Sequence, residues 1–242
     1  MIDNKKGELT TKKLVTMIIL ILSFSILLFF MFKLNFGQVT DDQVCHNSVV
    51  LKGKTEGFIG KLDCKTQYLC ISGGGDCLGS SKKIKVDPGN KDEILKVLAD
   101  EMADCWWLFG EGELEYAPGI SGFHCPICNS VKFSGIDQEI TYDHLYSYLE
   151  ENDLSEYDSR SYMKYLFDED KAARWFTQSL YLRQNRNTAF SLDEEYLIIT
   201  GRNNELEGIP IIGRSDKVLP VFFIKKSDLD KTKCTDYDIT TS

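Results

Sequence analysis

The pattern of hydrophobic positions changes along the chain, and its first segment is apolar on every side. Residues 14–32, LVTMIILILSFSILLFFMF, contain no charged side chain, and only Thr16, Ser23 and Ser25 are polar. As a helix rising about 1.5 Å per residue, this stretch would span roughly 28 Å, close to the hydrocarbon thickness of a bilayer. The alternative is a cleaved signal peptide, but its apolar region is usually shorter and no Ala-x-Ala-like site follows. We expect residues 14–36 to be an uncleaved transmembrane signal anchor.

The clearest amphipathic pattern predicts a helix over residues 90–109. Its apolar side chains recur at the helical period and share one face: Ile94, Leu95, Leu98, Met102, Cys105, Trp106 and Phe109. Asn90 suits an N-cap, and Gly110 suits a helix end. The pattern therefore directs Cys105 into the core. Trp107 falls on the polar side, where we expect either a neighbouring segment to cover it or a partner protein to bind it.

Shorter strands and helices are predicted along the rest of the chain. Strands are expected around 48–51 and 66–72, through 123–133, and at 195–201 and 218–226. Helices are expected near 139–151, 159–168 and 170–184. Pro220 predicts that the last strand lies at a sheet edge or carries a bulge. Because regular alternation of strand and helix is absent, we predict an α+β fold with a mainly antiparallel sheet and packed helices.

Charges predict the orientation of the apolar segment and argue against one class of partner. Residues 1–13 contain four lysines and two acidic side chains, which favours a cytoplasmic N-terminus at the cell membrane. Residues 37–47 would then form a linker, and residues 48–242 would form an extracytoplasmic domain. Beyond residue 36 the chain has 23 basic and 35 acidic side chains. Such a surface repels polyanions, so no nucleic-acid partner is expected.

All eight cysteines follow the apolar segment, as an oxidising compartment would favour. The candidates for disulfides are Cys45, Cys64, Cys70, Cys77, Cys105, Cys125, Cys128 and Cys234. Eight cysteines allow 105 connectivities, and spacing does not choose among them. We expect Cys105 to staple the helix to the strand that carries Cys125 and Cys128, through one of those two sulfurs. Cys234 could tie down the C-terminal tail.

The Cys-Pro-Ile-Cys pair, Cys125 and Cys128, is the strongest candidate for chemistry. A thiol–disulfide oxidoreductase would place the first cysteine at a helix N-terminus, but NSVKFSG follows and favours a strand. A zinc site would need four ligands, drawn from Cys105, His124, Cys125 and Cys128, and His124 would point away from its neighbour on a strand. We predict that the pair is structural, and the two alternatives stay open.

No other complete catalytic constellation occurs in the sequence. Glu111, Glu113 and Glu115 lie in GEGELEY, but no Asp-x-Asp-x-Asp loop accompanies them, so a solvated turn is expected rather than a calcium site. A G-x-S-x-G nucleophile elbow is absent. We expect no cofactor. The sequence favours a non-enzymatic module, held in the bilayer through residues 14–36, that binds a partner protein or supports an envelope assembly.

One part of the chain resembles a known group of proteins. ADEMADCWWLFGEGELEY followed by CPICNSVKF, behind an N-terminal anchor, resembles uncharacterised single-pass membrane proteins encoded in archaeal genomes. The matching residues are Cys105, Trp106, Phe109, Gly110, Glu111, Gly112, Cys125, Cys128 and Phe133. The resemblance implies that the helix and the CxxC pair form one structural module, and it implies no known activity.

Overall fold

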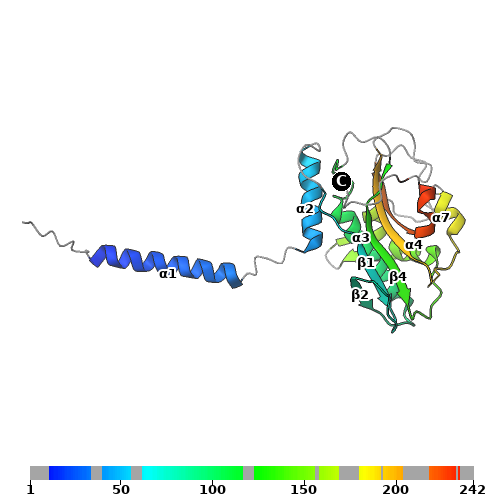
Figure 1. Cartoon of the computed structure of the whole chain (residues 1–242), viewed down its shortest axis with the longest axis horizontal. Helices are drawn as coiled ribbons and strands as arrows, with labels where there is room; N and C mark the ends of the chain where they lie inside the picture. The colour runs from blue at the N-terminus through cyan, green and yellow to red at the C-terminus, as the bar shows by residue number, and fades with distance from the viewer. Residues whose placement is uncertain are drawn as a thin grey trace, which may run out of the picture. The chain divides into compact units, whose positions relative to one another are not determined.

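The chain divides into two compact units, residues Met1–Thr40 and Asp41–Ser242 (Figure 1). The computed structural model describes residues 11–33, 40–55, 62–116, 123–155, 158–168, 180–191, 193–203, 218–232 and 234. The first unit contains helix α1 (Thr11–Lys33), with every described side chain exposed. Among the helices of the described residues, none combines the length and apolarity needed to cross a membrane. The span expected at 14–36 therefore stays a prediction from the sequence.

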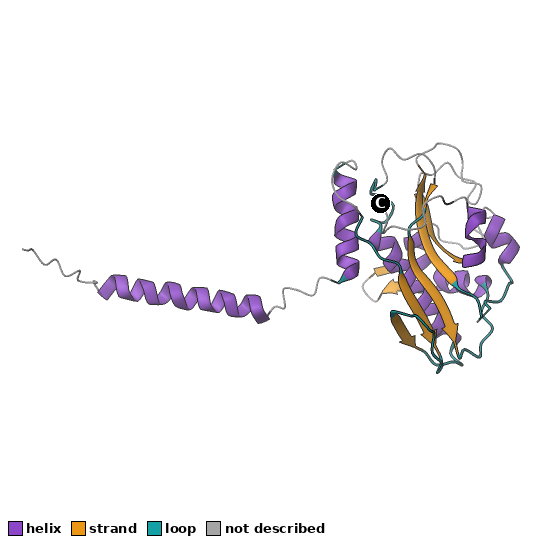
Figure 2. Ribbon diagram, viewed as in Figure 1, coloured by secondary structure: helices purple, strands orange, loops and turns teal. Residues whose placement is uncertain are grey.

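A six-stranded sheet organises the second unit, and Figure 2 shows it as one twisted sheet with helices packed beside it. Its strands run in the order β2 (Lys82–Lys85), β1 (Gln67–Ser72), β4 (Ile127–Ser134) and β7 (Tyr196–Asn203). Strand β8 (Val218–Lys225) also pairs with β7. The short β3 (Phe123–His124) pairs with β7 in the same register as β4, so Cys125 and Pro126 interrupt a single line of strand.

The direction of the strands agrees with the predicted class and adds one feature. All pairings of β7, with β3, β4 and β8, are antiparallel, and so is the separate pair β5 (Asp153–Ser155) and β6 (Asp158–Ser161). An α+β fold with a mainly antiparallel sheet is thus confirmed. In contrast, β1 runs parallel to both of its neighbours, β2 and β4. Among the described strands β8 pairs only with β7, as Pro220 indicated for an edge strand.

Helix α3 (Lys91–Leu108) has the boundaries that the sequence predicts. The Asn90 side chain accepts a hydrogen bond from the backbone N–H of Glu93 at its start. At its end, the N–H of Glu111 donates to the carbonyl of Trp106, and the N–H of Gly110 to that of Trp107, both at 3.0 Å. This is a Schellman motif, which needs a left-handed residue after the cap, and Gly110 has a φ of +75°. The predicted apolar face of α3 is buried.

The other helices are α2 (Asp41–Lys54), α4 (Tyr142–Glu151), α5 (Tyr162–Phe167), α7 (Leu180–Asn185) and the 3₁₀ helix η1 (Lys226–Thr232). Helix α2 differs from the prediction, which gives a linker at residues 37–47 and a strand at residues 48–51. Asp41 and Asp42 in its first turn complement the helix dipole. Cys45 and Val49 are buried one turn apart, a helical spacing that the short apolar run VVL conceals.

Around 159–184 the prediction of two helices is only partly matched. Strand β6 occupies residues 158–161, so α5 starts later than expected. Residues 180–185 are helical, and 169–179 lie outside the described residues. An aromatic group joins α4 to the sheet: Phe133, Tyr142, Phe190, Tyr196 and Phe223. All five are buried, and the rings of Tyr196 and Phe223 stack at 5.0 Å.

Candidate functional site

The Cys-Pro-Ile-Cys pair is divided between two disulfides. Cys128 is bonded to Cys105 of α3, and Cys125 is bonded to Cys234 in the C-terminal segment. The helix-to-strand bridge is therefore present and uses the second sulfur of the pair. All four residues are buried, and β4 rather than a helix follows Cys125. A redox catalyst of the CxxC type cycles a bond between its own two cysteines, which this pairing does not form.

The ligand set considered for zinc is not assembled either. The sulfurs of Cys105, Cys125 and Cys128 are all oxidised, and His124 is buried in β3. A cysteine binds zinc only as its thiolate, so these disulfides would have to be reduced first. Within the described residues, no group of three or more His, Cys, Asp or Glu side chains could hold a metal ion.

The other two disulfides hold the N-terminal part of the domain together. Cys45 of α2 is bonded to Cys64, ahead of β1, and Cys70 of β1 is bonded to Cys77. All eight cysteines are thus paired. Each bond constrains the unfolded chain and stabilises the fold by about 2–4 kcal/mol.

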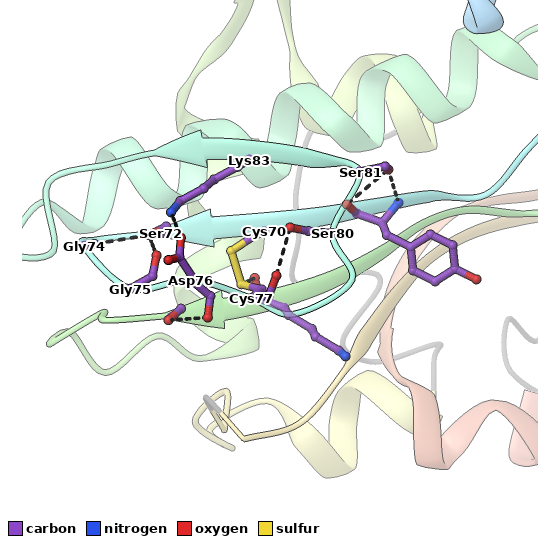
Figure 3. The surroundings of a disulfide bond; sticks show 12 residues. Cys70, Ser72, Gly74, Gly75, Asp76, Cys77, Ser80, Ser81 and Lys83 are labelled. Carbon is purple, nitrogen blue, oxygen red and sulfur yellow. Dashed lines mark hydrogen bonds and ion pairs between the residues drawn. A yellow bond between two sulfur atoms is a disulfide. The ribbon is translucent and has the colours of Figure 1, made fainter.

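Residues 73–81 connect β1 to β2 in an unusual way. Parallel neighbours normally need a crossover of a dozen or more residues, usually a helix, and this connection is shorter and non-helical. The segment lies against the sheet face that carries Cys70, where the disulfide fixes it (Figure 3). The hydroxyl of Ser134 donates to the carbonyl of Asp76 at 3.4 Å, and the N–H of Gly73 donates to the carbonyl of Ser134 at 2.9 Å.

The glycines of this connection permit its close approach to the sheet. A Cβ atom at Gly73 would lie 2.1 Å from the carbonyl oxygen of Gly135, and one at Gly75 would lie 2.1 Å from the Ser134 Oγ. Side chains do not fit at such distances. The glycine run therefore allows the connection to lie flat on β1 and β4, where sequence reasoning saw only a turn.

A tight turn at the end of the connection carries the most exposed large apolar side chain in the described part of the chain. Residues 77–80 form this turn, in which Gly79 has a φ of +80° and the hydroxyl of Ser80 donates to the carbonyl of Cys77 at 3.1 Å. Leu78 occupies the corner and is 94% exposed. Ser81 then binds both backbone groups of Tyr68, which is 50% exposed (Figure 3).

Three lysines lie on the sheet face against which this turn packs. The register places Lys83 and Lys132 opposite Cys70, and Lys85 opposite Ser72, so these lysines share the face that carries the disulfide. We call the group Tyr68, Leu78, Lys83, Lys85 and Lys132 the lysine face. The lysine face belongs to a chain whose net charge is −9.

Two acidic side chains on this face are already paired. Asp76 forms an ion pair with Lys83, and this hydrogen bond and charge lower the pKa of Asp76. Glu195 binds Lys226 at 3.0 Å and Lys132 at 4.0 Å, and it accepts a hydrogen bond from Ser130. Burial raises the pKa of Glu195, but the hydrogen bonds from Ser130 and Lys226 outweigh it and lower the pKa overall.

Trp107, which the sequence singles out, lies under α2. The imidazole of His46 stacks on the indole with 4.0 Å between ring centroids and 9° between planes. The Nδ1 of His46 lies 2.8 Å from the carbonyl oxygen of Trp107, near the C-terminus of α3. The Trp107 side chain is 38% exposed. A neighbouring helix therefore covers one face of the ring, and part of the ring remains accessible.

A buried carboxylate on α3 was missed by sequence reasoning. Glu101 accepts hydrogen bonds from the Lys82 ammonium at 2.6 Å and from the buried Asn129 amide at 2.8 Å. It follows Ile94 by seven residues, so the helical period itself places it on the apolar side. On the exposed side, Asp104 has a pKa raised to about 6, first by desolvation and then by the charge of Glu101.

The turn after α3 holds the glutamates of GEGELEY. Glu111 has a φ of +54° between two glycines that also have positive φ, and the Tyr165 hydroxyl donates to its Oε1 at 2.9 Å. This hydrogen bond joins the turn to α5. The arrangement is a helix stop with a fixed carboxylate, as expected of a turn after a helix cap.

No protein-family model, no curated protein and no solved structure matches the chain.

Proposed function

We propose that this chain is a membrane-anchored, extracytoplasmic protein without enzymatic activity that binds a partner protein through the surface around Trp107. The observation that carries the proposal is the Trp107 ring, partly exposed and fixed by stacking on His46. Tryptophan dominates many protein interfaces because a large ring binds with little loss of conformational freedom. A ring that is already held in place by His46 loses even less conformational freedom when a partner binds.

The proposed location rests on the sequence and on the cysteines. Residues 14–36 would anchor the chain, residues 1–13 would lie in the cytoplasm, and the domain beyond would lie outside. Four disulfides that bury seven of their eight cysteines fit an oxidising compartment.

The rejected alternatives would each require the disulfides to change. An oxidoreductase would need Cys125 and Cys128 to bond to each other, and a zinc domain would need both as thiolates. Each of the two cysteines instead holds a distant part of the chain to the sheet. Neither alternative is therefore proposed.

Site-specific photo-crosslinking in intact cells tests the partner surface. Benzoylphenylalanine at position 107 keeps an aromatic ring against His46, and the same amino acid at the exposed position 151, on α4, serves as the control. We expect a light-dependent protein adduct from position 107 and none from position 151, with all four disulfides retained in both variants. Equal adducts from both positions, or no protein adduct from position 107, would contradict the proposal.

A further inference from the structure

The exposure of the Leu78 side chain is not explained by packing within the folded domain. Its side chain is 94% exposed, at the corner of a turn fixed by the Cys70–Cys77 disulfide and by the Ser80 and Ser81 hydrogen bonds. A turn corner accepts polar residues at least as well as leucine. The disulfide and the glycine contacts hold the connection on the sheet, so the leucine is presented to the surroundings.

The charges near Leu78 point to a particular surface. Lys83, Lys85 and Lys132 lie on the same face, and the amphipathic Tyr68 is half exposed beside the returning chain. An apolar tip with a tyrosine and three lysines on the same face is the composition that suits the interface of an anionic bilayer. The three lysines outnumber the two carboxylates, Asp76 and Glu195, that pair with Lys83 and Lys132, whereas the chain as a whole is acidic.

We propose that the lysine face contacts the anionic headgroups of the membrane in which the chain is anchored, with the Leu78 side chain inserted among the lipids. The inference rests on the proposed anchor. A single leucine and three lysines would bind a bilayer only weakly from solution. On an anchored domain the association step is already made, so these groups need only orient it.

The acidic remainder of the domain strengthens this orientation. An anionic surface repels the acidic side chains and attracts the lysines, and both effects act within a Debye length of about 8–10 Å. The lysine face is then the one that faces the lipid. The Trp107 surface is built separately, from α2 and α3, and remains the surface proposed for a protein partner.

The test uses the full chain reconstituted into vesicles. A fluorescent amino acid replaces Ser80, two residues from Leu78, or, as a control, Glu151 on α4. Without the Ser80 hydroxyl, the Cys70–Cys77 disulfide, the Ser81 hydrogen bonds and the backbone hydrogen bond from Ser80 to Cys77 still fix the turn. Quenching by doxyl-labelled lipid is measured in phosphatidylcholine vesicles and in vesicles that also contain phosphatidylglycerol. We expect stronger quenching at position 80 than at position 151, and only in the anionic vesicles.

Substitutions separate the contribution of Leu78 to lipid contact from that of the lysines. Leu78→Ser should abolish the extra quenching at position 80, and Lys85→Gln with Lys132→Gln should reduce it to the level of neutral vesicles. Lys54→Gln with Lys91→Gln makes the same charge change on α2 and α3 and should leave the quenching unchanged.

Several outcomes would overturn the inference. If the chain stays with the vesicles but positions 80 and 151 are quenched alike, the anchor stands and the lysine face does not contact lipid. Equal quenching at position 80 in neutral and anionic vesicles would remove the role of charge. Shielding of position 80 in native membranes but not in vesicles would assign the face to a protein. Failure of the chain to associate with any vesicle would refute the anchor, and the inference with it.

Discussion

At the residue scale, neighbouring carboxylates on α3 have opposite effects on stability. Glu101 is buried but receives hydrogen bonds from Lys82 and Asn129, which compensate its loss of water. Asp104 instead lies near the negative charge of Glu101, and desolvation together with this charge raises the pKa of Asp104 to about 6. Its ionised form is therefore disfavoured in the folded state.

Replacing Asp104 with Asn should stabilise the protein only where the carboxylate is ionised. The folded pKa of about 6 lies above the unfolded value of about 3.9, so the contribution of Asp104 is favourable below pH 4 and is lost as the pH rises through 6. Asp104→Asn should raise the free energy of unfolding at pH 7, by less than about 1 kcal/mol because the residue is exposed. Denaturant unfolding at pH 4 and pH 7 measures this. The exposed Asp137→Asn is the control, and an equal gain at both pH values would refute the explanation.

The sequence places these residues but does not identify their partners. The prediction that Trp107 lies on the polar side of α3 agrees with the structure, whereas Glu101 was missed although the helical period puts it on the apolar side. The partner Lys82 lies in β2, which was not predicted, and His46 lies in α2, which was expected as linker. Local periodicity determines on which side a residue lies. Which side chain meets it depends on contacts that are distant in sequence.

At the element scale, the disulfides can be distinguished by how their losses combine. Cys105 and Cys128 share one bond, which closes a separation of 23 residues, so Cys105→Ser and Cys128→Ser should each lower the free energy of unfolding by about 3 kcal/mol. The double variant should cost no more than either single one. Cys125→Ser with Cys128→Ser breaks two bonds, and its cost should approach the sum. Denaturant unfolding without reductant measures all of these. If the Cys125→Ser, Cys128→Ser double variant loses no more free energy of unfolding than one single variant, Cys125 and Cys128 are bonded to each other.

Elements with long regular patterns are predictable, and those that depend on distant pairing are not. Helix α3, strand β1 and the interrupted strand β3–β4 match their predicted ranges closely. In α2, four apolar or small residues in a row suggest a strand, and only the burial of Cys45 and Val49 against the domain reveals the helical period. Strand β2 is too short and too charged to be recognised, because its position is set by pairing with β1 and by the Cys70–Cys77 bond.

At the scale of the whole molecule, the fold class follows from the order of the elements, whereas the surfaces follow from tertiary structure. The predicted α+β architecture is present, and its core joins the sheet to α3 and α4. The lysine face exists because a short connection lies flat on the sheet, and the Trp107 surface exists because α2 packs on α3. The linear pattern of residues indicates Trp107 but not its contact with His46, and it does not indicate the lysine face, since each surface combines segments that the sequence separates.

The proposed orientation of the chain in a membrane gives the last prediction. Residues 14–32 lack charge, four lysines precede them, and all eight cysteines follow and are paired. Disulfides form outside the cytoplasm, so the domain and the N-terminus should lie on opposite sides. With one epitope tag at each end of the full chain, protease added to intact cells should remove the C-terminal tag and spare the N-terminal one. Both tags should be lost after lysis, which is the control. A C-terminal tag that stays protected until lysis would place the domain inside, and the paired cysteines would then need another explanation.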